Sequence, residues 1–175
     1  TYDTKSDQHR PMVEGIVNTE GTNAAGFYYD YGSMEEVSVT TGANTPDMPW
    51  AGVMSQFIAK SGGNSYHGKL YADYENENIQ SRNIDDAQVA LGVKGGGGLQ
   101  ATDLNRLHSY HDLNGDVGGY MKKDKLWWYG SLRDQDAQSL LPNFPVKPFE
   151  THLQNITGKA TYAINSNNKL VGFAQ

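Results

Sequence analysis

The sequence predicts an all-β protein in which antiparallel strands form part of a membrane barrel wall, preceded by a small unit of mixed strands. From Tyr66 onward, strand-like segments alternate apolar and polar residues, and their connections are roughly 38, 3, 21 and 4 residues long in turn. Outer-membrane barrels have tight turns at one rim and long loops at the other. The composition agrees, because 20 Gly, 11 Tyr and only 37% hydrophobic residues suit strands that show half of their side chains to lipid.

Residues 1–63 are expected to form the small unit, with short strands of its own. Glu36–Thr40 alternates as a strand should, with Val37 and Val39 on one face. Other strand-like stretches are Met12–Ile16 and Val53–Lys60. The Gly-rich turn that begins at Ser61 ends the unit, because Gly and Asn accept the backbone angles of a turn.

Residues 64–175 are expected to form about five strands of the wall, with long outer loops near 75–112 and 134–154. The strands are Tyr66–Tyr74, Leu113–Met121, Lys125–Arg133, Asn155–Ile164 and Lys169 to the end. Gly and Ala recur on the apolar side of these strands. A soluble core needs larger side chains to reach close packing, whereas a surface that faces lipid does not. The alternation by itself fits a soluble antiparallel sheet equally well.

Charge and composition exclude several classes of function. A net charge of −6 argues against general nucleic-acid binding, which needs clustered Lys and Arg. Cysteine is absent, so disulfides and thiolate metal sites are excluded. Ser61 and Ser65 lie near His67 in sequence, but neither is part of a nucleophile-elbow motif. We therefore expect no enzyme activity and no cofactor.

The nearest approach to a metal-binding pattern is His108-Ser-Tyr-His111-Asp112. Two His residues three apart could chelate a metal if the segment were helical, with Asp112 in support. Ordinary residues of a loop or barrel rim are the preferred interpretation, so no metal site is predicted.

The chain starts at Thr1 without an initiator Met and stops at Gln175 within an alternating pattern. We expect it to be part of a longer protein.

Four motifs follow one another in a characteristic order. They are MVEGIVNTEG at 12–21, SMEEVSVTTGA at 33–43, AGVMSQFIAKSGGNSYHGKLYADY at 51–74 and DLNGDVGGYMKKDKLWWYGSLRDQ at 112–135. In this order they resemble the plug-to-barrel junction and first barrel strands of TonB-dependent outer-membrane receptors. The subgroup that they resemble most is the large bacterial type, which often carries an N-terminal carboxypeptidase-regulatory-like domain.

The resemblance implies that residues 1–63 are the C-terminal part of a plug domain and that the parent is a 22-stranded barrel in the bacterial outer membrane. It also implies import of an unidentified ligand, contact with outer-membrane lipid, and an energy-coupling partner in the inner membrane that acts through an N-terminal segment missing here. Other subunits of a larger assembly are a further expectation. Plug loops of this family face the ligand, so the candidate binding residues are the aromatic ones: Phe27, Tyr28, Tyr29, Tyr31 and Trp50.

The alternative is a secreted soluble β-domain that binds carbohydrate through Tyr and Trp, whose rings offer large contact area at low entropic cost. The two hypotheses differ in where the apolar faces lie. A soluble domain buries them in its own core, whereas a barrel wall leaves them uncovered by protein.

Overall fold

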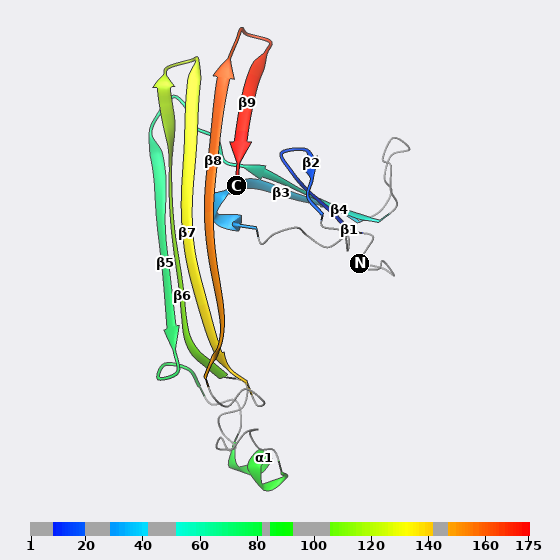
Figure 1. The fold of residues 1–175 in the computed structure, drawn as a ribbon, viewed down its shortest axis with the longest axis vertical. Helices are drawn as coiled ribbons and strands as arrows, with labels where there is room; N and C mark the ends of the chain where they lie inside the picture. The colour runs from blue at the N-terminus through cyan, green and yellow to red at the C-terminus, as the bar shows by residue number, and fades with distance from the viewer. Residues whose placement is uncertain (1–8, 20–28, 42–51, 82–84, 93–105, 142–146) are drawn as a thin grey trace. The chain divides into compact units, whose positions relative to one another are not determined.

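The computed structural model describes residues 9–19, 29–41, 52–81, 85–92, 106–141 and 147–175, which are mostly β-strand (Figure 1). The chain divides into two compact units. The first contains Thr1–Gly68, Asp116–Ser131 and Ile156–Gln175, and the second contains Lys69–Gly115 and Leu132–Asn155. The long strands β6, β7 and β8 contribute residues to both units.

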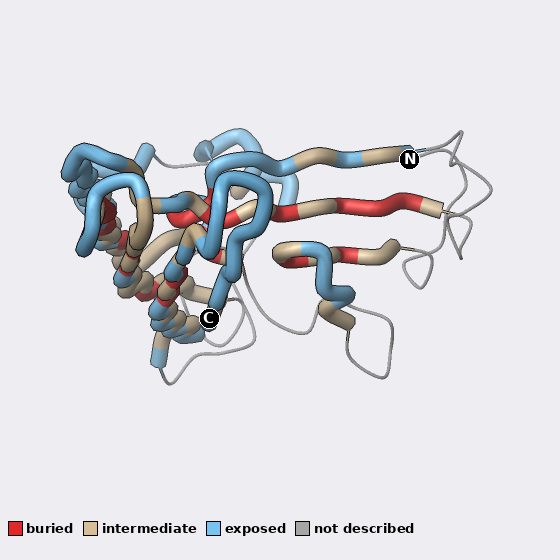
Figure 2. The backbone as a smooth tube through the Cα atoms, turned by 90° about the horizontal axis from the view of Figure 1, so that it is seen from above, coloured by how far each residue is buried: buried red, intermediate tan, exposed pale blue. Residues whose placement is uncertain are grey.

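The small sheet belongs to the first unit and has the strand order β2-β1-β4-β3. Its strands are β1 (His9–Val13), β2 (Ile16–Val17), β3 (Met34–Thr40) and β4 (Val53–Ala59). β1 pairs with β4 in parallel, and the other pairs are antiparallel. Central β4 is buried along most of its length, whereas edge strand β3 is mostly exposed (Figure 2). The strands predicted at Glu36–Thr40 and Val53–Lys60 are confirmed, whereas the stretch Met12–Ile16 is divided by a turn at Glu14 and Gly15 between β1 and β2.

An apolar core holds the small sheet together. Val13, Met34, Phe57 and Ala59 form its buried centre, and Tyr29 and Phe173 pack against it. Phe173 comes from β9 (Lys169–Ala174), a strand of the other sheet. The core of the first unit therefore joins the small sheet to the last strand of the chain.

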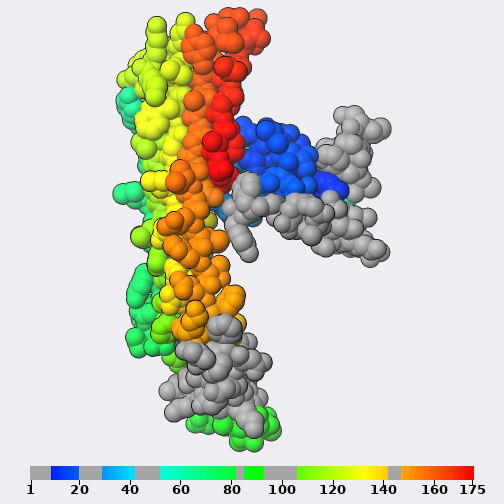
Figure 3. All heavy atoms as spheres, viewed as in Figure 1, coloured from blue at the N-terminus to red at the C-terminus, as the bar shows by residue number. Residues whose placement is uncertain are grey.

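The large sheet has the strand order β5-β6-β7-β8-β9 (Figure 1). Besides β9, its strands are β5 (His67–Asn76), β6 (Arg106–Lys122), β7 (Leu126–Leu140) and β8 (Phe149–Ala163). All five lie where the alternation predicted strands. β8 and β9 lie side by side, orange and red in Figure 3. They are antiparallel, with Gly158 opposite Ala174 and Ala163 opposite Lys169.

The strands run further than the sequence indicated. The segments predicted as loops near 75–112 and 134–154 instead contain the beginning of β6, the end of β7 and the beginning of β8. The extensions are polar, so the apolar alternation that revealed the strands is absent there. They are joined by side-chain pairs across the sheet, including Arg133 with Asp112 at 2.7 Å and His111 with Asp134 at 3.0 Å. Such cross-strand pairs stabilise a ladder as apolar pairs do.

Both predicted tight turns are confirmed. β6 and β7 are joined at Lys123–Lys125, where Lys125 N–H donates to Lys122 O and Asp124 has a φ of 59°. β8 and β9 are joined at 165–168, where the side chain of Asn165 accepts the backbone N–H groups of Asn167 and Asn168. Asn supplies this bond because its short side chain reaches the backbone two and three residues on.

One short helix, α1 (Asp86–Ala90), lies in the connection between β5 and β6, within the segment predicted as a long loop near 75–112. Asp85 and Gln88 form a reciprocal capping box at its start. Within the part of the chain that the structure describes, no helix is both long enough and apolar enough to cross a membrane.

The two faces of the large sheet differ in an unusual way. Large apolar side chains on one face, called here the apolar face, are exposed. Among described residues they include Leu70, Leu113, Val117, Met121, Leu132, Ile156, Tyr162 and Leu170. On the opposite face, the polar face, the buried residues include Asp112, Asp116, Ser131, Thr157 and Lys159. An ordinary soluble sheet buries its apolar face and leaves polar side chains in water.

Candidate functional site: a polar seam in the first unit

Buried polar side chains connect the small sheet and the segments next to it to the polar face of β6, β7 and β8. We call this group the polar seam, and all of it lies in the first unit. Its members are Glu14, Asp30, Ser33, Lys60, Asp116, Tyr129, Ser131, Thr157 and Lys159. The seam therefore joins residues up to 145 positions apart in the chain.

Lys159 and Glu14 form one of the two ion pairs described in the seam. Lys159 Nζ lies 2.7 Å from Glu14 Oε1 and also donates to the carbonyl oxygen of Ala59 at 2.9 Å. The same Glu14 oxygen accepts the backbone N–H of Ala59 at 2.8 Å. Because both charges are largely shielded from water, their mutual contact and these extra hydrogen bonds offset the cost of desolvation.

The backbone at Glu14 is held in the left-handed region, with a φ of 51°. Together with Gly15, at a φ of 81°, it makes the two-residue turn between β1 and β2. A residue with a Cβ adopts this conformation at a cost of about 1–2 kcal/mol. The Glu14 N–H donates to Phe57 O at 3.0 Å, so bonds from both backbone and side chain stabilise the turn.

A second ion pair anchors the end of β4. Lys60 Nζ lies 2.7 Å from Asp116 Oδ2, and the hydroxyl of Tyr129 donates to the same oxygen at 3.3 Å. Asp116 is in β6 and Tyr129 is in β7, so one carboxylate ties Lys60 to two strands of the large sheet. Lys60 N–H also donates to Ser33 O at 2.9 Å, which ties it to the 3₁₀ turn at Tyr31–Ser33.

Neutral and acidic groups complete the seam around that turn. Asp30 and Ser33 are buried, and the Ser33 hydroxyl donates to Asp30 O at 2.8 Å. The hydroxyl of Ser131 in β7 donates to Asp30 Oδ2 at 3.2 Å, and the hydroxyl of Thr157 in β8 donates to Ser33 Oγ at 3.4 Å. Hydrogen bonds to the large sheet thus replace the water that these groups would bind if exposed.

The side-chain contacts described for the seam are hydrogen bonds and ion pairs, and the apolar contact of Phe173 with the small-sheet core lies beside them. A Ser–His contact does occur nearby, with His9 Nε2 at 2.8 Å from Ser55 Oγ. Ser55 is only 6% exposed on central strand β4, so a substrate cannot approach its hydroxyl. That pair stabilises the sheet.

The predicted aromatic residues are only partly within the described residues. Phe27, Tyr28 and Trp50 lie outside them. The structure brings Tyr29 and Tyr31 together on Phe57: the Tyr29 ring stacks at a centroid distance of 4.2 Å, and the Tyr31 ring meets Phe57 edge-on at 5.9 Å. Burial raises the pKa of the Tyr29 hydroxyl, and Asn18 partly opposes that rise. Tyr31 is 62% exposed, so its ring is open to a ligand.

The metal-binding alternative required His108 and His111 on a helix. Both lie in strand β6, where residues three apart point to opposite faces. His108 Nδ1 is 3.2 Å from Glu77, whereas His111 Nε2 is 3.0 Å from Asp134. In the described ranges, no three His, Asp or Glu side chains are grouped to hold a metal ion.

Sequence reasoning did not select the seam as a site. The alternation of β6 and β8 puts Asp116 and Lys159 opposite the apolar residues, where the structure has them, but their partners come from residues 60 and 14. A signal was present, because a charged residue in mid-strand that ends up buried needs a partner of opposite charge. The alternation predicts the face of the sheet on which each charged residue lies, but it does not predict which residue pairs with it.

Comparison with known proteins gives one distant relative. The chain is 23% identical over 131 residues to the TonB-dependent transporter Oar of Myxococcus xanthus. The match covers 73% of this chain and only 11% of that transporter. No family model matches the sequence. No solved structure matches it either.

Proposed function

We propose that this chain forms part of a TonB-dependent outer-membrane receptor that binds a scarce external ligand and imports it actively. In this proposal residues 1–63 are the end of the plug domain, and residues 64–175 are the first five strands of a 22-stranded barrel. The similarity to a TonB-dependent transporter supports a transport role and an outer-membrane location.

The observation that carries the proposal is the reversal of the two faces of the large sheet. Ile156 in the middle of β8 is 70% exposed, whereas its sequence neighbour Thr157 is 1% exposed. A strand that spans an outer membrane has this pattern, with apolar residues toward lipid and polar residues toward the lumen. The soluble carbohydrate-binding alternative needs the apolar face to be covered, and the described residues do not cover it.

The polar seam has a natural place in this proposal. A plug must stay attached to the wall at rest and must rearrange when a ligand passes. Contacts built from hydrogen bonds and ion pairs can be exchanged for contacts with water, whereas a dry apolar interface would lose its full burial energy.

The partners in this proposal are lipid, an inner-membrane energy-coupling protein and the imported ligand. The ligand would meet the aromatic set Phe27, Tyr28, Tyr29, Tyr31 and Trp50, and no enzyme activity is proposed.

The test begins with location and energy dependence. Cells that make the native gene product are fractionated, and the protein is followed by an antibody against the 106–141 segment. Uptake of a panel of labelled siderophores, cobalamin, glycans and peptides is then compared between wild-type and deletion strains. We expect the protein in the outer membrane and the loss of uptake of one ligand class. A protonophore should abolish the same uptake in wild-type cells, because the energy comes from the inner membrane.

Recovery of the protein in a soluble periplasmic or secreted fraction would overturn the barrel assignment. Ligand uptake that persists at the wild-type rate in the presence of protonophore would leave an outer-membrane protein and refute active import.

A further inference from the structure

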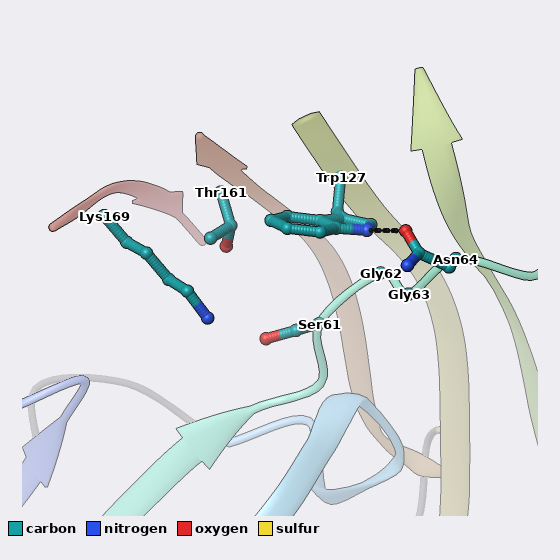
Figure 4. Close-up of a pocket in the computed structure, with 7 residues that line it drawn as sticks. All are labelled: Ser61, Gly62, Gly63, Asn64, Trp127, Thr161 and Lys169. Atoms are coloured by element: carbon teal, nitrogen blue, oxygen red, sulfur yellow. Dashed lines mark hydrogen bonds between the residues drawn. The ribbon is translucent and has the colours of Figure 1, made fainter. Parts of the chain in front are cut away.

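A polar cavity of about 340 Å³ lies at the tight-turn end of the large sheet, within the first unit (Figure 4). It is bounded by the segment after β4, the beginning of β7, the end of β8 and the beginning of β9. The lining residues are Ser61, Gly62, Gly63, Asn64, Trp127, Thr161 and Lys169. The volume falls within the range of small-molecule sites, which is about 300–1,000 Å³.

The lining offers hydrogen-bond donors and a positive charge, and it contains no carboxylate. The ammonium group of Lys169 points into the cavity toward the hydroxyl of Ser61 (Figure 4). Within the described part of the chain, the hydroxyls of Ser61 and Thr161 have no hydrogen-bond partner. Lys169 Nζ lies 5.8 Å from the centroid of the Trp127 ring, a cation–π contact that leaves its N–H donors available.

Lysine residues are concentrated in and next to the β6–β7 turn, at the same end of the large sheet as the cavity. Lys122, Lys123 and Lys125 belong to or flank the β6–β7 turn, and the acidic residue among them is Asp124. Asp124 already accepts a hydrogen bond from the side chain of Asn64. The tight-turn end is therefore positive in a protein of net charge −6, which favours an anion.

Hydrogen bonds and close backbone packing hold the Gly62–Asn64 wall of the cavity. Asn64 Oδ1 accepts hydrogen bonds from Trp127 Nε1 at 2.7 Å and from Asp124 N–H at 2.9 Å. Gly62 approaches the backbone of the neighbouring strands so closely that a Cβ there would lie 2.2 Å from Trp128 O. A wall that is already held by these contacts need not be ordered when a ligand binds.

We propose that this cavity binds a phosphate ester, with the Lys169 ammonium paired to the phosphate and the Ser61 and Thr161 hydroxyls donating to its oxygens. The cavity has room for the organic part of the ester beside the Trp127 ring. This site goes beyond the importer role and does not depend on it. The glycerol phosphate group is the simplest probe, because it occurs both as a free metabolite and as the head group of phosphatidylglycerol.

The experiment uses the native gene product in nanodiscs. Binding of sn-glycerol 3-phosphate is measured by calorimetry with phosphatidylcholine discs, and retention of phosphatidylglycerol is measured by native mass spectrometry with mixed discs. We expect Lys169→Gln to weaken binding at least about tenfold, since it removes a charge-assisted hydrogen bond. Thr161→Val keeps the charge and should weaken binding by about threefold.

Lys123→Gln is the matched control, because it removes one lysine charge from the β6–β7 turn at the same end of the sheet without changing a lining residue. It should change binding by less than about twofold, as expected for a screened surface charge. Binding of the soluble probe supports a free phosphate ester, and retention of phosphatidylglycerol alone supports a lipid head group. Equal effects of Lys169→Gln and Lys123→Gln, or no binding of either probe by the wild type, would overturn the site.

Discussion

Lys159 Nζ and Glu14 Oε1 are 2.7 Å apart, although 145 residues separate them in the chain. Lys159 is in β8 of the large sheet, and Glu14 forms the turn between β1 and β2 of the small sheet. The Lys159 side chain is 7% exposed and that of Glu14 is 18% exposed. The pair also bonds both backbone polar groups of Ala59, so three separate segments meet at two charges.

Breaking this pair should loosen the small sheet. Glu14→Ala leaves the Lys159 charge buried without its carboxylate, a change that costs about 3–5 kcal/mol for a buried pair. Ala59 N–H also loses its acceptor. Hydrogen exchange of the peptide that covers Val53–Ala59, followed by mass spectrometry on the membrane-embedded protein, should show faster exchange in the variant.

Glu35→Gln is the matched control, because Glu35 is an exposed residue of edge strand β3. Its exchange rates should equal those of the wild type. The double variant Glu14→Ala with Lys159→Met removes both charges and should recover part of the lost protection, since the uncompensated charge is gone. Additive effects of the two substitutions would show that the pair does not couple the sheets.

Gly62 should be intolerant of any side chain. An added Cβ would lie 2.2 Å from Trp128 O and 2.3 Å from Gly119 O, both of them backbone atoms that cannot move aside. We expect Gly62→Ala to destabilise the fold by about 1–3 kcal/mol or more, the range seen for overpacking. Urea unfolding of the refolded protein measures the loss.

The neighbouring residue supplies the control. A Cβ at Gly63 meets nothing within 4 Å, so Gly63→Ala should unfold at the wild-type urea concentration. A Gly62→Ala midpoint equal to that of Gly63→Ala would show that the segment after β4 does not pack against β6 and β7.

Ile156 should behave as a residue in contact with lipid. It is 70% exposed at the middle of β8, so in water its replacement by Arg would be harmless. If it faces the centre of a bilayer, Ile156→Arg should destabilise the protein by about 2–4 kcal/mol. Folding into lipid vesicles over a range of urea concentrations gives this energy directly.

Leu91, which is 86% exposed just after α1, provides the comparison. Leu91→Arg should leave the folding energy within about 0.5 kcal/mol of the wild type, as most surface changes do. Equal and small effects at both positions would support a soluble sheet.

The contact between β5 and β6 should weaken in acid. Arg106 Nη2 donates to Glu77 Oε2 at 2.6 Å, and this bond, followed by the contact with His108, lowers the pKa of the Glu77 carboxyl below its ordinary value. A carboxyl whose pKa falls on folding stabilises the fold above its unfolded pKa. That contribution is lost as the pH falls from the ordinary carboxyl range through the lowered value.

Exchange of the Glu77 N–H, which donates to His108 O at 3.1 Å, reports on this contact. After correction for intrinsic rates, its protection should be constant from pH 7 to about pH 5 and should fall in stronger acid. Glu77→Gln should exchange faster at pH 7 and lose the acid dependence. An unchanged acid response in Glu77→Gln would assign the effect to another group, and exposed Glu75→Gln serves as the control.

Alternation was a good guide to the strands wherever one side of the strand is apolar. Val117 and Met121 marked β6, and Ile164 and Leu170 bracketed the β8–β9 turn. It failed at the polar ends of the same strands, because Asp112 and Asp134 pair with Arg and His across the ladder and leave no apolar period to detect. The helix α1 was missed because five residues are too few for a helical period.

Local residue chemistry was enough to specify the apolar parts of the strands, the tight turns and the face on which their side chains lie, because these depend on neighbours within a few positions. Packing of the small sheet against the large one decides instead that Glu14 pairs with Lys159 and Lys60 with Asp116. It also brings Ser61 and Thr161 to the same cavity. Packing brings together groups more than 50 residues apart. Each buried charge then needs a partner of opposite charge, and the local sequence pattern does not predict which residue that partner is.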